Sequence, residues 1–183
     1  MSQRRKNDFY PTPGWATEVL LSNLPDEIEA DSMVIYEPCS GQGDISNILK
    51  KKYPIVLTND IDPEMPSDGH IDATLDKAWT LQVDWTITNP PFNQAYQIVS
   101  KAVKNSKNGV AALLRLSFLE PTMERGPWLA ANPPDKMIVL PRISFTGDGK
   151  TDSVTCAWMI WLNKYPKYDR IIVKQKEMKK PIF

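Results

Sequence analysis

The chain has 183 residues, of which 42% are hydrophobic and 24% charged, a balance typical of one compact globular domain with a real core. Its 22 basic and 22 acidic residues cancel, so we do not expect a protein that holds a long stretch of nucleic acid by its phosphates, and any such grip must be local. The sequence has no apolar run of about 18 residues and begins with polar residues, which predicts a soluble, cytoplasmic protein with no membrane span.

Metal and nucleophilic chemistry have little material in this sequence. The two cysteines, Cys39 and Cys156, do not have the spacing of metal ligands. His70 is the only histidine, and a lone histidine in a glycine-containing loop is more often exposed than catalytic. We therefore expect no metal site and no catalytic triad.

Short apolar runs rich in β-branched residues alternate with helical spacing along the chain. They predict strands at 33–36, 55–58, 84–88, 110–114, 137–140 and 154–162, and helices near 45–49, 94–105 and 121–131. This alternation predicts an α/β domain with a largely parallel sheet covered on both faces. The last two strands are too close for a helical crossover and should form an antiparallel hairpin. We expect a single domain over 1–183, with peripheral tails at 1–8 and 166–183.

A glycine-containing turn follows the first predicted strand. The segment 37–44 reads EPCSGQGD and precedes the first predicted helix. Gly41 and Gly43 allow the backbone to approach a ligand closely, and the next helix N-terminus suits a carboxylate or phosphate. A dinucleotide fingerprint would need a third glycine where this chain has Ser46, which disfavours a nicotinamide cofactor. An ordinary strand-to-helix turn is the alternative.

Acidic residues follow the second predicted strand. Asp60 lies roughly 20 residues after the glycine turn, where an α/β nucleotide site holds ribose hydroxyls, and Ile61 would pack on an adenine ring. Asp62, followed by a proline, is typical of a turn. Asp72 either accepts a hydrogen bond from an adenine amino group or caps a helix at 75–79, and the sequence leaves both open.

The tetrapeptide Asn89-Pro90-Pro91-Phe92 follows the third predicted strand. Its two prolines fix two φ angles and remove two N–H donors, which leaves a rigid loop rich in acceptors. The side-chain oxygen of Asn89 and the carbonyl of Pro90 can accept both hydrogens of an exocyclic NH2, which directs the nitrogen lone pair at an electrophile. Phe92 offers a face on which a base can stack. A simple turn that ends a strand is the alternative.

Together these residues resemble the S-adenosylmethionine-dependent amino-methyltransferases with an Asn-Pro-Pro-Phe tetrapeptide, chiefly the DNA adenine-N6 group and its small phage-type members. The motifs span roughly residues 9–162, with those of the cofactor before that of catalysis. The resemblance implies a Rossmann-like, mostly parallel, seven-stranded sheet that ends in an antiparallel hairpin. It also implies S-adenosyl-L-methionine as cofactor, the N6 amine of adenine in DNA as methyl acceptor, and an intracellular enzyme that a phage could encode.

The resemblance further implies a set of cofactor-binding residues. Tyr10-Pro11-Thr12-Pro13 is similar to the N-terminal motif near the methionine part of the cofactor, segment 37–43 to the glycine loop, and Asp60-Ile61 to the ribose and adenine pair. The implied cofactor-binding residues are Tyr10, Thr12, Pro13, Glu37, Pro38, Ser40, Gly41, Gly43, Asp60, Ile61, Asp72 and Asn89.

Catalysis and target binding are implied in the same way. The catalytic residues would be Asn89, Pro90, Pro91 and Phe92. Phe92 would also contact the target base, Phe145 would lie against it, and Arg142 would hold a phosphate, a role for which Lys150 is also available. A core position for Phe145 is the alternative.

The chain departs from the family after the last hairpin. DNA methyltransferases with this motif order usually carry a separate target-recognition domain there, whereas only residues 163–183 remain here. The inserts near 62–80 and 115–135 would then recognise the target, or specificity is low, or a protein partner supplies it. Adenine in RNA and glutamine in protein are alternative planar amines, and a catalytically silent module that keeps the cofactor fold is an alternative of another class.

Overall fold

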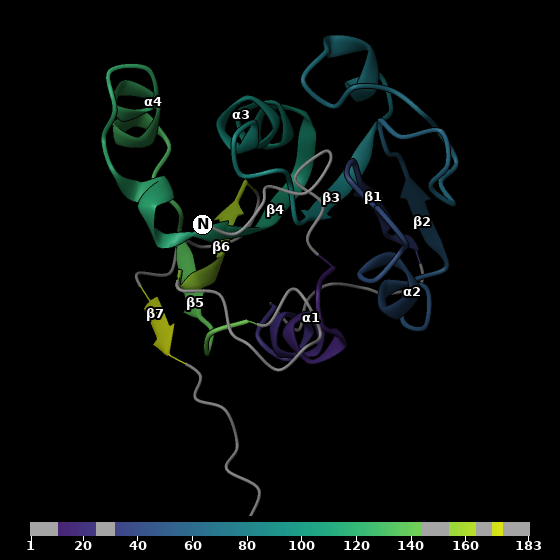
Figure 1. Ribbon diagram of the computed structural model, residues 1–183, viewed down its shortest axis with the longest axis horizontal. Coiled ribbons are helices and arrows are strands. Elements are labelled where there is room, and N and C mark those ends of the chain that lie inside the picture. Colours follow the sequence, from purple (N-terminus) through teal and green to yellow (C-terminus); the bar gives the residue numbers. More distant parts are fainter. Residues whose placement is uncertain (1–10, 25–31, 144–153, 164–169, 174–183) are drawn as a thin grey trace, which may run out of the picture.

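The computed structural model describes residues 11–24, 32–143, 154–163 and 170–173, and the structural statements below refer to these residues. They build one twisted sheet with helices on both faces (Figure 1). The strand order is β2-β1-β3-β4-β6-β5-β7. The strands are β1 Val34–Glu37, β2 Ile55–Thr58, β3 Val83–Thr88, β4 Ser106–Arg115, β5 Lys136–Val139, β6 Cys156–Leu162 and β7 Arg170–Val173.

Strand directions confirm the predicted mostly parallel sheet with an antiparallel hairpin. Strands β1 to β4 pair in parallel, whereas β6 runs antiparallel to both β4 and β5. Beyond the hairpin, β7 pairs in parallel with β5 at the sheet edge, in the segment 166–183 that the sequence predicts to be peripheral. Residues 171–173 are β-branched, and β7 adds a strand along the outer edge of β5.

The helices are α1 Gly14–Leu21, α2 Ser46–Leu49, α3 Ala95–Asn105 and α4 Arg125–Ala131, with 3-10 turns η3 Asp76–Trp79 and η4 Leu116–Leu119. Helix α3 matches its predicted range, α4 is shorter than predicted, and α2 is a single turn. Helix α1 is not predicted, because its buried face includes the polar residue Thr17 beside Ala16 and Leu20. The extra helix covers a sheet face that would otherwise be exposed.

Successive strand residues point to opposite faces of the sheet, which divides the core into two clusters. On one face Trp85 and Ile87 pack with side chains of α1 and α2, and on the other Val110 and Ala112 pack with α3. Figure 1 shows α1 and α2 on one side of the strands and α3 on the other. Two tryptophans of β6 fix the layers: the Trp158 Nε1–H donates to the Ala16 carbonyl at 2.8 Å, and the Trp161 Nε1–H donates to the Asn132 carbonyl at 3.0 Å.

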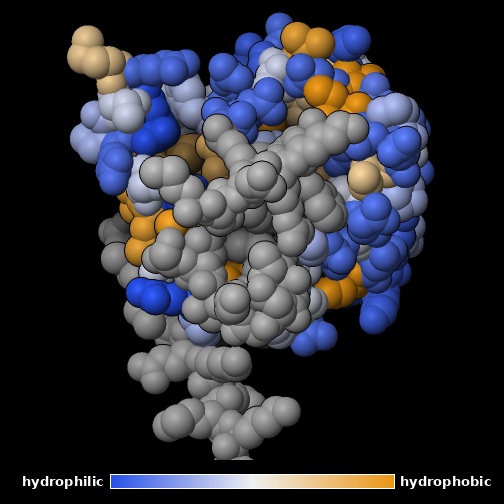
Figure 2. Space-filling model, viewed as in Figure 1, coloured by the Kyte–Doolittle hydropathy of each residue, from blue (hydrophilic) through white to orange (hydrophobic). Residues whose placement is uncertain are grey.

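The face of the molecule in Figure 2 is mainly hydrophilic, with apolar side chains in small separate patches. The most exposed large apolar side chain among the described residues is Met123, which is 98% exposed just before α4. Single exposed apolar residues are common on soluble domains. Within the described parts of the chain, no helix is long and apolar enough to cross a membrane.

Close packing at the sheet centre leaves no room for a side chain at Gly109. A Cβ at this position would lie 2.6 Å from Cη2 of Trp85 and 2.7 Å from the Trp161 carbonyl oxygen. We expect Gly109→Ala to lower the free energy of unfolding by about 1–3 kcal/mol, measured by urea denaturation. Gly14→Ala is the control, because its added Cβ would meet only the flexible end of Ile48, and its effect should stay within about 1 kcal/mol. Equal effects of the two substitutions would contradict this account.

Candidate cofactor and catalytic site

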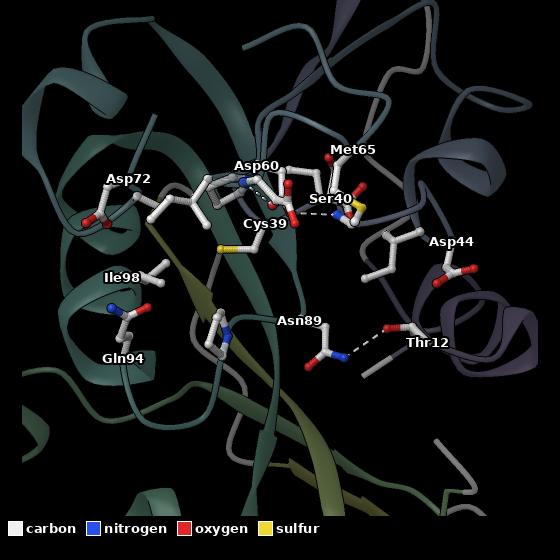
Figure 3. Close-up of a pocket in the computed structure, with 18 of the residues that line it drawn as sticks. Thr12, Cys39, Ser40, Asp44, Asp60, Met65, Asp72, Asn89, Gln94 and Ile98 are labelled. Carbon is white, nitrogen blue, oxygen red and sulfur yellow. Dashed lines mark hydrogen bonds between the residues drawn. The ribbon is translucent and has the colours of Figure 1, made fainter. Parts of the chain in front are cut away.

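The strand order determines where a cavity can form. Strand β1 lies between β2 and β3, so the chain leaves β1 toward one side of the sheet and later returns on the other. The loops after β1 and β3 therefore separate, and a crevice opens at the carboxyl ends of these strands. A cavity of about 270 Å³ lies there. It is lined by the loops after β1, β2 and β3, together with Thr12 and Ile98 (Figure 3).

The glycine turn after β1 requires its glycines. Gly41 and Gly43 have φ angles of 50° and 85°, a region that side chains with a Cβ rarely adopt. A Cβ on Gly43 would also lie 3.1 Å from the side-chain nitrogen of Asn47. The turn closes through the Gly43 N–H, which donates to the Ser40 carbonyl at 2.8 Å. Glu37, Pro38, Ser40 and Gly41 line the cavity, whereas Gly43 shapes the turn behind it.

Asp60 joins the loops that follow β1 and β2. Its Oδ2 accepts a hydrogen bond from the Gly41 N–H at 2.8 Å, and its Oδ1 accepts one from the Asp62 N–H at 2.9 Å. A carboxylate has about four acceptor positions, so each oxygen can accept a further bond from a ligand. Asp60 and Ile61 line the cavity as expected of a ribose and adenine pair, and Asp62 lines it as well.

Asn59 holds the adjoining loops, a contribution that sequence reasoning missed. The side chain is 2% exposed, and its Nδ2 donates to the carbonyls of Pro38 at 3.0 Å and Ile71 at 2.7 Å. Its Oδ1 accepts a bond from the Ile71 N–H at 2.9 Å. Asn59 thereby brings the segment with Asp72 to the cavity. In the sequence, only the position of Asn59 between a predicted buried strand and Asp60 points to such a role.

The structure excludes one of the two alternatives for Asp72, the helix cap. Its Oδ1 accepts bonds from the backbone N–H and the hydroxyl of Thr74, at 2.8 and 2.7 Å, in a local turn. The short helix η3 has Leu75 at its N-cap and no side-chain cap, so the helix-cap interpretation is wrong. An Asp side chain bonds most readily to the N–H two residues on, which explains the difference. Asp72 lines the cavity, at the end where Figure 3 shows Gln94 and Ile98.

The tetrapeptide lies at the other side of the same cavity. Asn89 and Pro91 line it, and Pro90 is buried beside them. The Asn89 Nδ2 donates to the hydroxyl oxygen of Thr12 at 3.0 Å (Figure 3). The Pro91 carbonyl accepts a bond from the Gln94 N–H at 3.0 Å, which leads the chain into α3. The described residues form no backbone hydrogen bond to the Pro90 carbonyl.

Like Gly43 and Pro90, the remaining predicted residues that the structure describes do not line the cavity. Pro13 precedes α1 as its N-cap. Phe92 packs against the core, and the guanidinium carbon of Arg115 lies 4.3 Å from the centre of its ring. Arg142 is exposed. Tyr10, Phe145 and Lys150 lie outside the described residues.

Among the described residues, the cavity is lined by several carboxylates and by no lysine or arginine. The acidic lining residues are Glu37, Asp44, Asp60, Asp62, Glu64 and Asp72. Only half of these six carboxylates, Glu37, Asp60 and Asp72, were predicted from the sequence, because the other three lie in ordinary turn sequences. It also missed the apolar and neutral lining residues Cys39, Ile45, Met65, Ala73, Gln94 and Ile98, which come together only in the folded chain. A cavity of this charge favours a ligand that carries positive charge.

Glu37 is the most unusual of these carboxylates. It is 1% exposed, and within the described part of the chain its Oε2 has no hydrogen-bond partner. Burial raises the pKa of Glu37 well above its ordinary value, although hydrogen bonds from Ser46 oppose the shift. Burial also raises the pKa of Asp44, against the effect of the Thr12 backbone N–H. The side-chain pKa of Cys39 is raised by burial and by nearby Asp60.

No protein-family model and no curated protein matches the sequence. Solved structures do match its fold. A proposed RNA methyltransferase from Pyrococcus horikoshii superposes with a TM-score of 0.69 and 17% identity, over 87% of this chain and 91% of that one. The fold is that of the S-adenosylmethionine-dependent methyltransferases.

Two further methyltransferases share this fold over only part of their length. A type I restriction-modification methyltransferase subunit from Streptococcus thermophilus matches with a TM-score of 0.65 and 14% identity, over 93% of this chain and 48% of that one. A class I S-adenosylmethionine-dependent methyltransferase proposed in Listeria monocytogenes matches with a TM-score of 0.63 and 11% identity, over 87% of this chain and 62% of that one. The chain therefore spans about half of the restriction subunit.

Within its described residues it has no cluster of three or more His, Cys, Asp or Glu side chains that could hold a metal ion.

The buried Glu37 should make the stability of the ligand-free protein depend on pH. A carboxyl group whose folded pKa is raised is protonated more readily in the folded state, so the folded state loses stability as pH rises above the unfolded pKa. We expect Glu37→Gln to stabilise the protein at pH 8, and the gain to shrink toward pH 5, measured by urea unfolding at both values. Glu18→Gln, at an exposed position of α1, is the control. A gain from Glu37→Gln that is independent of pH would contradict this expectation.

Proposed function

We propose that this protein transfers the methyl group of S-adenosyl-L-methionine to the exocyclic N6 amine of adenine in DNA. One observation carries the proposal: Asp60 at the glycine turn and Asn89 of the Asn-Pro-Pro-Phe tetrapeptide line the same cavity. A nucleotide-type binding turn and a loop suited to an NH2 group thus face each other. This pairing supports the transfer of a group from a bound cofactor to an amine.

The chemistry of the lining residues fits this cofactor. S-adenosyl-L-methionine carries a sulfonium and an ammonium group, and the six lining carboxylates with no lysine or arginine suit both cations. The unpartnered Oε2 of the buried Glu37 is an acceptor suited to the ammonium group. When bound, the cofactor supplies an electrophilic methyl carbon on a positively charged sulfur.

The cofactor would be held along the whole cavity. Asp60 would accept hydrogen bonds from the ribose hydroxyls, with its two present bonds keeping the carboxylate fixed. Asp72 and Ile98, at one end, would contact the adenine ring. Asn89, which Figure 3 shows between this end and Thr12, would lie next to the reactive part of the cofactor. No metal ion is required for this arrangement.

Asn89 and Pro90 would prepare the target amine for attack. The Asn89 side-chain oxygen and the Pro90 carbonyl would accept its two hydrogens, which removes the nitrogen lone pair from ring conjugation. The nitrogen then forms a bond to the methyl carbon as the carbon–sulfur bond breaks, and the amine afterwards releases one proton to water. Because the two prolines stiffen this loop, the acceptors need little reorganisation.

The target is the finer part of the proposal. Phe92, Arg142 and Phe145 would contact an extruded base and its phosphate, and a protein partner could supply sequence recognition. The restriction-modification subunit among the similar folds favours DNA, whereas the Pyrococcus protein keeps adenine in RNA as an alternative. Protein glutamine presents a similar amine. A silent module that only binds the cofactor is the alternative of another class.

These targets are separated by incubating the purified protein with methyl-labelled S-adenosyl-L-methionine and, in parallel, unmethylated duplex DNA, single-stranded DNA, total RNA and protein extract. We expect the label as N6-methyladenine in DNA. Label in RNA or in glutamine would replace the target but keep the amine chemistry. Cofactor binding without label anywhere would favour the silent module, and absence of cofactor binding would contradict the proposal as a whole.

Asn89→Ala should lower methyl transfer by about 100-fold or more, because the amine loses one of its two acceptors. Cofactor affinity, measured by calorimetry, should change by less than about threefold. A tenfold change would need a loss of about 1.4 kcal/mol in binding free energy, which we do not expect from one peripheral contact. Asn93→Ala is the matched control: the residue is exposed, does not line the cavity and should leave transfer unchanged. Equal loss of transfer and of cofactor affinity in Asn89→Ala would exclude the assigned role.

A further inference from the structure

We propose that Thr12 is a positioning residue that sets the orientation of the Asn89 side-chain amide, so that its oxygen faces the target amine. This inference rests on the proposed function and adds to it a residue of the N-terminal segment. The resemblance implies only a cofactor contact for Thr12. The hydrogen bond between the two side chains assigns it an additional task.

The contact joins two distant parts of the chain at the floor of the cavity. The Asn89 Nδ2 donates to Thr12 Oγ1 at 3.0 Å, across 77 positions of sequence. Thr12 is 5% exposed and directly precedes Pro13 and α1. In Figure 3 the amide nitrogen of Asn89 points toward Thr12 and its oxygen points away from it.

An asparagine amide has two chemically different ends, and only one of them suits an amine hydrogen. The oxygen accepts a hydrogen bond, whereas the NH2 group donates and would repel an incoming NH2 group. A rotation of about 180° about the last side-chain bond exchanges the two ends and changes the outline of the side chain very little. Some neighbouring group must therefore favour one orientation. A hydroxyl oxygen on one side accepts from the NH2 group and leaves the carbonyl oxygen on the other side.

Thr12 is itself held in place. Its backbone lies near the Asp44 carboxylate and acts against the rise that burial causes in the pKa of Asp44. Asp44 follows the glycine turn and lines the cavity. Helix α1 continues from Pro13 and is fixed to the sheet by the bond from Trp158 to the Ala16 carbonyl. Thr12 therefore offers its hydroxyl from a rigid position, as a positioning residue must.

The orientation can be measured without any substrate. In the ¹⁵N-labelled, cofactor-free protein, the Asn89 side-chain amide signals are identified by their loss in Asn89→Ala. We expect slow exchange of one Asn89 amide proton with water in the wild type, and an exchange about tenfold faster or more in Thr12→Val, which keeps the shape but removes the acceptor. Thr12→Ser should retain the protection. Unchanged exchange in Thr12→Val would overturn the inference, as would evidence that the Thr12 hydroxyl donates to the amide oxygen.

Kinetics with whichever substrate the wild type methylates provide the second measurement. At saturating cofactor, Thr12→Val should lower kcat by about 10- to 100-fold while Thr12→Ser stays near the wild type. Thr17→Val is the matched control, because the Thr17 hydroxyl is buried in α1 without a hydrogen-bond partner. A loss of cofactor affinity with unchanged kcat would make Thr12 a cofactor contact only and overturn the inference. If the wild type methylates no substrate, the proposed function fails, and the exchange rates still decide the orientation.

Discussion

The position of β1 between β2 and β3 is the constraint on which the rest of the site depends. All three strands run in parallel, so their carboxyl ends meet at one edge of the sheet. The loops must diverge there, and a divergent loop pair exposes backbone groups that need partners. Asn59 and Asp60 supply these partners: Asn59 bonds to the backbone of the loops beside it, and Asp60 bonds to the glycine turn. The cavity is thus held open by side chains of the loop that follows β2.

Asp60 uses both of its carboxylate oxygens to hold the loops around the cavity. Its bonds to the N–H groups of Gly41 and Asp62 fix the carboxylate before any ligand arrives. Glu37 differs, because its Oε2 is buried without a partner and its pKa is raised. Such a group destabilises the ligand-free fold and gains the most from a cationic ligand. Among the described residues, the site therefore combines one carboxylate with both oxygens in hydrogen bonds and one, Glu37, whose Oε2 has no such bond.

The sequence predicted the features that depend on local chemistry. The positions of all strands from β1 to β6 follow from apolar runs, the turn from glycines that adopt positive φ angles, and Asp60 from its distance to that turn. The features that failed depend on contacts between distant segments. Helix α1 was not predicted, because it has a polar residue on the face that packs against the distant strands. The lining residues Gln94 and Ile98 lie at the N-cap of α3 and within it. The sequence of this segment predicts an amphipathic helix but does not show that these two residues reach the cavity.

Phe92 belongs to a motif that is visible in the sequence, but the surroundings of its ring depend on the fold. The sequence presents an aromatic face for a base, but the structure places the Arg115 guanidinium 4.3 Å from the ring centre and packs part of the side chain on the core. Arg115 ends β4, the strand next to β3, so the register of two neighbouring strands brings the cation to the ring. At most one face of the ring then remains for a base. The guanidinium places positive charge beside the ring, in contrast to the acidic lining of the cavity.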